Sequence, residues 1–203
     1  MTQTTLWDYP KSSASYRVRI ALKLAQIRYR TMPVDLLAGA HKEAEHVARN
    51  PQGRVPVLEI DGHRLTQSLA ILDYLDATRD LGLLPATPVW RARVQAAAQC
   101  IAIDLHPVCN LSVMRHATGG QEPARTEWMQ HFIRPGLVAF EQMLEGLAAD
   151  GCPAPQRASL MDICLIPQLY NARRWGVSYG DLNRVVDIEA RCAADPAFVN
   201  AAP

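Results

Sequence analysis

The stretch Lys11–Leu22 constrains the fold of this chain more than any other part of its sequence. Before it, the apolar residues 5–7 indicate a short strand, which Pro10 ends. Hydroxyl residues follow where the next helix must begin: Ser12, Ser13 and Ser15. Apolar residues then recur at the three- and four-residue intervals of a buried helix face: Val18, Ala21, Leu22 and Ala25. The stretch therefore predicts a helix N-terminus whose amides and partial positive charge can hold a carboxylate or a thiolate.

Residues 12–22 resemble the motif of the zeta-class glutathione transferases, the maleylacetoacetate and maleylpyruvate isomerases. The family motif has Ser-Ser-Cys, a small residue, an aromatic residue and then Arg-Val-Arg-Ile-Ala-Leu; here Ala14 stands at the cysteine position. The resemblance covers nearly the whole chain. It implies the glutathione transferase fold, which is a thioredoxin-like α/β domain followed by an all-α domain, with glutathione as cofactor.

The composition is that of an ordinary globular protein, with 49% hydrophobic and 20% charged residues among 203. Twenty-one basic and twenty acidic residues give a net charge of +1, so nothing favours nucleic acid or an anionic membrane as a partner. No segment resembles a signal peptide or approaches the ~20 apolar residues of a membrane span. We therefore expect a cytoplasmic protein.

Five cysteines lack the spacing of a redox pair or a zinc site: Cys100, Cys109, Cys152, Cys164 and Cys192. We expect reduced thiols, most of them buried, and no metal. Cys109 is the one that could differ, because it lies among polar residues. None of the five is a strong candidate nucleophile.

The order of patterns over residues 1–85 predicts a thioredoxin-like βαβαββα domain. After the first strand and helix, residues 29–34 alternate as a strand does, and helical spacing returns over His41–Arg49. Two apolar runs then flank Asp61-Gly62, the strongest short signal for a hairpin turn. Another helix is expected to begin at Thr66-Gln67-Ser68.

Three further features match the family's glutathione site. Pro56 corresponds to a proline that is cis in thioredoxin-like folds, so the backbone of Val55 is implied to pair with the cysteinyl part of glutathione. Gln67 and Ser68 are either simple helix caps or the groups that receive the γ-glutamyl carboxylate at a helix N-terminus. His41 stands where relatives carry a polar residue that reaches the glycyl carboxylate.

We expect domain boundaries of 1–82 for the glutathione-binding domain, 83–88 for a linker and 89–203 for an all-helical domain that binds substrate and dimerises. Residues 90–115 indicate one long helix, kinked at Pro107, and residues 127–149 another that Pro135-Gly136 interrupts. Ser159 and Asp162 have the spacing of a capping box, which predicts the start of a further helix.

Two segments of the helical domain are expected to supply the polar groups on the substrate side. Residues 104–112 resemble the family's His/Gln-Pro-x-x-Asn-Leu-Ser, which places His106, Asn110 and Ser112 on roughly one helical face at the cofactor. Near residue 174, relatives use an arginine to clamp a substrate carboxylate; we favour Arg174 and regard Arg173 as a surface charge. Some maleylpyruvate isomerases carry an arginine where this chain has Leu111, which favours maleylacetoacetate.

The resemblance implies a glutathione-dependent cis–trans isomerase that converts maleylacetoacetate, or maleylpyruvate, to its fumaryl isomer by reversible thiolate addition in aromatic-acid catabolism. Ser13 is the preferred hydrogen-bond donor to the thiolate, supported by Ser12 and Ser15. Lys11, Arg174 and Arg17 are expected to hold the carboxylates and the enolate charge; alternatively, Arg17 or Arg19 makes a structural ion pair between domains.

Two other functions are compatible with the sequence. One is a general glutathione S-transferase that conjugates α-halo acids or other electrophiles, although Ala14 removes the thiol that dehalogenase-type chemistry needs. The other is a non-catalytic regulatory binding protein on the same fold, which the retained Ser13, Val55-Pro56 and Gln67-Ser68 argue against. A homodimer is expected for the isomerase, because the family's sites lie beside the dimer interface.

Overall fold

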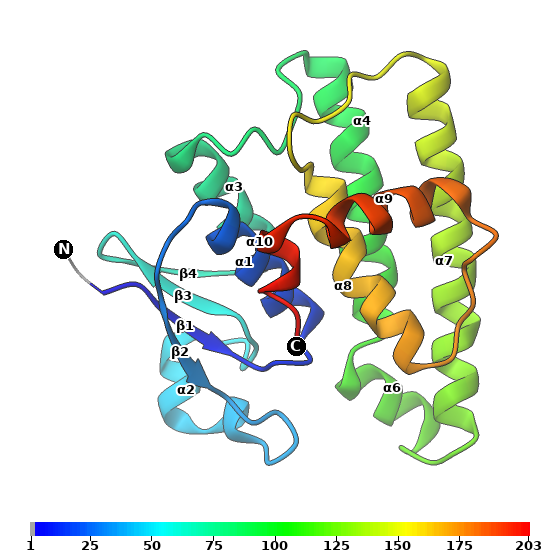
Figure 1. Cartoon of the computed structure of the whole chain (residues 1–203). Helices are drawn as coiled ribbons and strands as arrows, with labels where there is room; N and C mark the ends of the chain where they lie inside the picture. The colour runs from blue at the N-terminus through cyan, green and yellow to red at the C-terminus, as the bar shows by residue number, and fades with distance from the viewer. Residues whose placement is uncertain (1–2) are drawn as a thin grey trace. The chain divides into compact units, whose positions relative to one another are not determined.

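The structure is a computed structural model that describes residues 3–203. Its contacts divide the chain into two compact units (Figure 1). The first unit comprises residues 3–81 together with Asp195–Pro203, and the second comprises Gly82–Ala194. Each unit has its own buried core and is described here by itself.

The first unit is built on a four-stranded mixed sheet. The strands are β1 (Thr5–Asp8), β2 (Arg30–Pro33), β3 (Val57–Ile60) and β4 (His63–Thr66), in the spatial order β2-β1-β3-β4. β1 pairs in parallel with β2, whereas β3 is antiparallel to both β1 and β4. The helices between strands are α1 (Ser13–Leu24), the short 3-10 turn η1 (Ala40–Lys42) and α2 (Ala44–Arg49), and α3 (Ser68–Arg79) follows β4. This confirms the predicted βαβαββα order.

The hairpin between β3 and β4 turns where the sequence predicts. Asp61 and Gly62 have φ angles of 54° and 81°, so both adopt the left-handed conformation that a two-residue hairpin turn requires. Apolar residues from β1, α1, β3 and α3 fill the core of this unit; those with no exposed surface include Leu6, Val18, Ile20, Leu58 and Leu72. The core fixes α1 and α3 against one another, and both helix N-termini carry candidate site residues.

The C-terminal segment packs on α1 of the first unit. Its short helix α10 (Pro196–Val199) contacts α1, and the two helices are drawn next to each other in Figure 1. The Tyr16 hydroxyl donates to the Phe198 carbonyl at 3.4 Å, and Arg19 Nε donates to the Ala201 carbonyl at 2.8 Å. The expected division placed these residues in the helical domain. Long-range hydrogen bonds of this kind leave no local pattern in the sequence.

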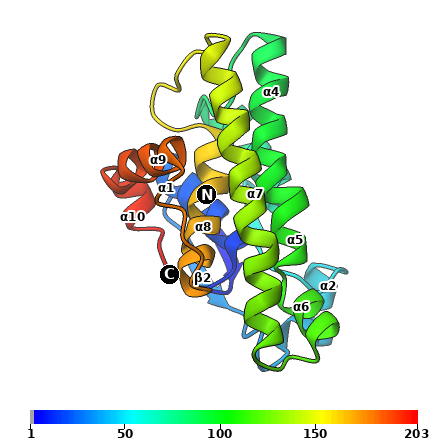
Figure 2. The same ribbon diagram turned by 90° about the vertical axis from the view of Figure 1, so that its right-hand side faces the viewer.

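The regular secondary structure of the second unit is helical in all the residues that the structure describes. Its elements are α4 (Pro88–Gln99), a π-helical segment η2 (Cys100–Leu105), α5 (His106–Val108), α6 (Leu111–Thr118), α7 (Ala124–Ala149), α8 (Leu160–Arg174) and α9 (Asn183–Ala193). Figure 2 shows α4, α5 and α6 following one another along α7. None of these helices, nor any other within residues 3–203, has the length and hydropathy to span a membrane.

Two predictions about this unit were wrong. The helix expected over residues 90–115 is not continuous, because the backbone at Asn110 (φ −64°, ψ 142°) leaves the helical region between α5 and α6. Conversely, α7 runs through Pro135 and Gly136 without interruption. Gly136 has a packing role instead, since a Cβ there would lie 2.8 Å from Leu105 Cδ2 in the π-helical segment.

The start of α8 confirms the predicted capping box. The Asp162 amide donates to Ser159 Oγ at 3.2 Å, and the Ser159 amide donates to Asp162 Oδ2 at 2.7 Å. Arg191 adds a 2.9 Å ion pair to the same buried carboxylate. Asp162 therefore joins α8 to α9 as well as capping its own helix.

Candidate active site

The serine turn connects β1 to α1 and gives its three hydroxyls different surroundings. Ser12 is the N-cap, and its Oγ accepts from the Ser15 amide at 3.2 Å. Ser13 is the first residue of α1 and retains 8% of its surface exposed, whereas Ser15 has none. Ser12 and, in part, Ser13 therefore remain accessible at the N-terminus of α1, where the helix carries partial positive charge.

Ser15 does not fit the role that the sequence suggested for it. Its Oγ is fully enclosed and has no hydrogen-bond partner within residues 3–203. A hydroxyl without accessible surface cannot contact a thiolate, so the structure removes Ser15 from the set of thiolate donors. Ser15 follows Ser12 by three residues because the Ser15 position supplies the backbone amide that donates to the Ser12 side chain in the helix cap.

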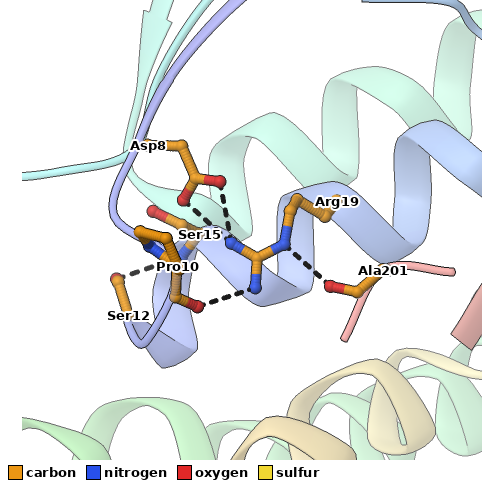
Figure 3. A network of polar contacts seen from close by, with 6 residues as sticks. All are labelled: Asp8, Pro10, Ser12, Ser15, Arg19 and Ala201. Carbon is orange, nitrogen blue, oxygen red and sulfur yellow. Dashed lines mark hydrogen bonds and ion pairs between the residues drawn. The ribbon is translucent and has the colours of Figure 1, made fainter. Parts of the chain in front are cut away.

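Arg19 stabilises the serine turn through a buried network of hydrogen bonds (Figure 3). Its Nη1 donates to both carboxylate oxygens of Asp8, at 2.9 and 2.8 Å, and its Nη2 donates to the Pro10 carbonyl at 2.9 Å. Its Nε donates to the carbonyl of Ala201. Of the two arginines, Arg19 thus makes a structural ion pair, but with Asp8 of its own unit and not between domains. Neither Asp8 nor Ala201 was expected to take part.

Arg17 belongs to α1, is buried, and its side chain contacts the first residue of α3. Only 2% of its surface is exposed, and Nη1 donates to Ser68 Oγ at 3.1 Å. The expected role of Arg17 at the substrate's carboxylates and enolate is therefore not supported, because a side chain this enclosed cannot contact a substrate. Its place beside Ser68 was not apparent from the sequence, since the two residues are 51 positions apart.

The N-terminus of α3 has no side-chain cap. Gln67 precedes the helix with φ 67° and makes no capping hydrogen bond; its Nε2 donates instead to Gln52 Oε1 at 2.7 Å. Ser68 is the first helical residue and is 6% exposed. The interpretation of Gln67 and Ser68 as simple caps is therefore wrong, and the open helix end with its partial positive charge fits an anion. Gln52, which sequence reasoning missed, orients Gln67.

Val55 and Pro56 lie immediately before β3. The peptide bond between them is cis, as the resemblance implied. Within residues 3–203, the Val55 amide has no hydrogen-bond partner, since the pairing of β3 with β1 and β4 begins at Val57. An unpaired backbone donor at a half-buried position fits main-chain pairing with a peptide.

His41 offers a ring nitrogen at the 3-10 turn η1. Its Nδ1 is enclosed and has no hydrogen-bond partner in the described part of the chain. Burial lowers the pKa of His41 below its usual value of 6.5, and the neighbouring charges of Lys42, His46 and Arg54 lower that pKa further. This cluster favours a negatively charged group beside the ring. Lys11 is exposed at the turn before α1 and is free to reach an anion from solvent.

The polar residues expected on the substrate side occupy the break between α5 and α6. His106 begins α5, Asn110 is the N-cap of α6, and Ser112 is exposed within α6. Because the chain is extended at Asn110, the three do not share one helical face, and that prediction was wrong. The Asn110 side chain makes no capping hydrogen bond, so its amide remains available to a ligand.

The two arginines at the end of α8 differ in their partners. Arg173 pairs with Glu189 and donates to the Tyr179 hydroxyl at 2.7 Å. Arg174 is exposed, stacks over the Tyr170 ring at 5.8 Å and has no ion-pair partner among residues 3–203. Arg174 as a carboxylate clamp therefore stays a prediction, while Arg173 is engaged by Glu189 and Tyr179.

Cys109 is structural. It is 8% exposed, and burial raises the pKa of its thiol to about 12, an effect that Gln168 only partly opposes. All five cysteines are free thiols. In the described residues, no group of three or more His, Cys, Asp and Glu side chains is placed to hold a metal ion.

Comparison with known proteins gives a consistent result. Residues 2–77 match the glutathione S-transferase N-terminal domain. The chain is 55% identical over 205 residues to maleylacetoacetate isomerase of Rhizobium meliloti (strain 1021), with 99% of this chain and 96% of the relative covered. It is also 39% identical to maleylacetoacetate isomerase of Pseudomonas aeruginosa, with 98% and 95% covered.

Two solved structures extend the similarity to the whole fold. One is the holo structure of a maleyl pyruvate isomerase, described as a bacterial zeta-class glutathione S-transferase, with a TM-score of 0.90, 32% identity and coverage of 98% and 96%. The other is maleylacetoacetate isomerase from Anaeromyxobacter dehalogenans 2CP-1 with glutathione bound, with a TM-score of 0.85, 37% identity and coverage of 99% and 95%. The resemblance to the zeta class and the expected fold class are confirmed. The chain belongs to the zeta-class glutathione transferase family, the family of the maleylacetoacetate and maleylpyruvate isomerases.

Proposed function

We propose that this protein is a glutathione-dependent isomerase that converts maleylacetoacetate to its fumaryl isomer. The observation that carries the proposal is a set of polar groups in the first unit without partners in the described chain: the Val55 amide, His41 Nδ1 and the uncapped start of α3. Each coincides with a position at which the family resemblance implies a different part of glutathione. Such groups are costly to bury unless a ligand pairs with them.

Glutathione would be held mainly by the first unit. The start of α3, with Ser68 and Gln67, receives the γ-glutamyl carboxylate, while the backbone of Val55 pairs with the cysteinyl part. His41 attracts the glycyl carboxylate, and Lys11 is an exposed cation for a carboxylate of glutathione or of the substrate. The second unit is the substrate-binding domain in this proposal, and His106, Asn110 and Ser112 are the polar groups that it is proposed to contribute.

Glutathione, when bound, supplies the sulfur nucleophile for reversible addition to the cis double bond. Ser13 donates its hydroxyl proton toward that sulfur, and the N-terminus of α1 adds partial positive charge. Ser12 keeps the first turn of α1 in place by its cap. Together these groups favour the deprotonated form of the thiol near neutral pH.

Arg174 fixes the substrate by a carboxylate. A guanidinium can donate two parallel hydrogen bonds to a carboxylate, and Arg174 is exposed without a competing acid in the described residues. Holding that end leaves the rest of the diketo acid free to rotate about the bond that addition converts to a single bond. Leu111, in place of the arginine of some maleylpyruvate isomerases, supports maleylacetoacetate as the substrate.

The proposal includes a homodimer that acts in the cytoplasm on intermediates of aromatic-acid breakdown. Light scattering coupled to size-exclusion chromatography tests the dimer directly, since a mass near twice 22.5 kDa is expected. No nucleic acid or membrane partner is proposed, in keeping with a net charge of +1.

The ultraviolet assay of maleylacetoacetate isomerisation tests the activity, with and without glutathione and with maleylpyruvate in parallel. Turnover that requires glutathione and is faster with maleylacetoacetate supports the proposal. Glutathione binding without turnover of either acid would contradict the isomerase assignment and direct the search to electrophiles of a general transferase.

A further inference from the structure

We propose that Arg17 is a positioning residue that sets the enzyme's preference for the γ-glutamyl carboxylate of glutathione, acting through Ser68. The inference rests on the proposed glutathione site and gives Arg17 a role distinct from contact with substrate. The carboxylate is an anionic group of an otherwise peptide-like ligand. Its recognition therefore depends on how the start of α3 is organised.

The buried guanidinium of Arg17 lies against the first residue of α3. Arg17 Nη1 lies 3.1 Å from Ser68 Oγ, and the two residues are 2% and 6% exposed. Arg17 is part of α1 and Ser68 begins α3, two helices that pack against one another in the core of the first unit. The rigid core thus fixes both partners of this hydrogen bond.

This hydrogen bond determines which way the Ser68 hydroxyl points. A guanidinium has only donors, so Ser68 Oγ must accept from Arg17. The hydroxyl keeps one proton of its own, which is thereby directed to another acceptor. A serine at a helix start otherwise tends to bond with nearby backbone groups. Arg17 therefore converts Ser68 into a donor for a carboxylate.

The charge of Arg17 acts through the same hydroxyl. A hydrogen bond from an ionised donor is stronger than one between neutral groups, and it polarises the Ser68 hydroxyl, so that the proton of Ser68 becomes a better donor. Because both side chains are shielded from solvent, water weakens this hydrogen bond less than it would at the surface. A polarised hydroxyl at the start of α3 favours a carboxylate over a neutral group.

The test compares two ligands on each protein by titration calorimetry. One ligand is glutathione, and the other is γ-aminobutyryl-cysteinyl-glycine, which differs from it by lacking the α-carboxylate of the γ-glutamyl residue. We expect wild type to prefer glutathione by about tenfold or more, the effect of a hydrogen bond to a charged group. In R17M and in S68A this ratio should fall by a similar factor, and R17K should restore part of it.

The double variant R17M/S68A shows whether Arg17 acts through Ser68. It should have the same ligand ratio as S68A alone, since no hydroxyl remains for Arg17 to orient. A further loss in the double variant would mean that Arg17 acts on the carboxylate directly and would overturn the proposal. R28M is the matched control, because Arg28 is exposed in the same unit, and its ratio should equal that of wild type.

The remaining outcomes are equally decisive. A purely structural Arg17 would weaken both ligands alike, so an unchanged ratio in folded R17M contradicts the inference. If R17M does not fold by circular dichroism, S68A decides alone: a ratio equal to wild type in S68A would contradict the inference, because Arg17 is proposed to act through Ser68. Failure of wild type to bind glutathione at all would instead overturn the proposed function, which keeps the two failures distinct.

Discussion

Arg19 binds both carboxylate oxygens of Asp8 beneath the serine turn, at 2.9 and 2.8 Å, with the two side chains almost fully buried. Asp8 ends β1 and Arg19 lies in the second turn of α1, so the ion pair closes the loop that carries Ser12. The other two nitrogens of this guanidinium donate to backbone carbonyls: Nη2 to Pro10 in the loop, and Nε to Ala201 in the C-terminal segment (Figure 3). The Arg19 side chain therefore links α1 to β1, to the loop and to the C-terminal segment.

Removing either charge of this pair should strongly destabilise the protein. R19M leaves the Asp8 carboxylate buried without its cation, and loss of one partner of a buried pair costs about 3–5 kcal/mol. Urea unfolding gives the free energy. The control is R64M, which breaks the exposed Arg64–Glu59 pair and should cost at most about 1 kcal/mol. Equal losses in the two variants would contradict the structural role of Arg19.

The three serines of the turn should respond differently to substitution. S13A removes the proposed donor to the thiolate, so kcat should fall by roughly a hundredfold and the pKa of the bound thiol should rise. S15A removes an enclosed hydroxyl that has no partner in the described chain, so activity should be unchanged and stability equal or higher by about 1 kcal/mol. Thiolate absorbance and thermal melting measure the two effects. An S15A variant that loses the thiolate signal would contradict the assignment.

His41 should make ligand binding depend on pH. Its pKa in the free protein lies below 6.5, so the ring is mostly neutral at pH 7, and a carboxylate placed beside it favours the charged form. Binding then takes up a proton, and affinity should rise about threefold to tenfold as the pH falls from 7.5 to 5.5.

S-methylglutathione is the ligand for this measurement, because it has no thiol that titrates. The affinity of H41Q should stay flat over the same range. A wild-type affinity that falls with decreasing pH would place the glycyl carboxylate elsewhere. Without ligand the sign is opposite: a lowered His pKa means that the contribution of His41 to stability is present above pH 6.5 and is lost as the pH falls through the folded-state pKa.

The arginines at the end of α8 provide a matched pair. R174M should raise KM for the acid substrate and lower kcat/KM by about 10- to 100-fold, because it removes a charged hydrogen-bond donor to a carboxylate. R173M loses an exposed pair with Glu189 and should leave both constants near their wild-type values. Steady-state kinetics decide between them, and a larger effect for R173M would reverse the assignment.

Two glycines of α7 should give opposite stability changes when replaced by alanine. G136A forces a methyl group against Leu105, which is 4% exposed and has little room to move, so we expect a loss of about 1–3 kcal/mol. G146A meets nothing closer than 3.7 Å and should gain up to about 1 kcal/mol from helix propensity. Chemical denaturation of both variants tests the packing of α7 on the π-helical segment. A gain in G136A would show that this contact is loose.

Local chemistry alone predicted most of the first unit. The serine cap of α1, the Asp61-Gly62 turn and the Ser159–Asp162 capping box depend on residues within three positions of one another, so their patterns survive in the sequence. The helix boundaries near Pro107 and Pro135 were predicted less well. A proline permits either a break or a continuous helix, and packing of Leu105 against Gly136 is a tertiary contact.

In the candidate site, too, some features follow from local sequence patterns and others from tertiary contacts. Residue types, spacing and the family resemblance predicted the serine turn, Val55-Pro56, Gln67-Ser68 and Arg174 as site residues, because each belongs to a short motif. The sequence could not tell Arg17 from Arg19, or Ser13 from Ser15, since neighbours on one helix differ only in what the rest of the fold brings to them. Tertiary packing placed Asp8 and Ala201 around Arg19, Ser68 against Arg17, and nothing polar at Ser15. The sequence by itself determined which chemical groups are available; burial and long-range hydrogen bonds decided which of them face a ligand and which hold the fold.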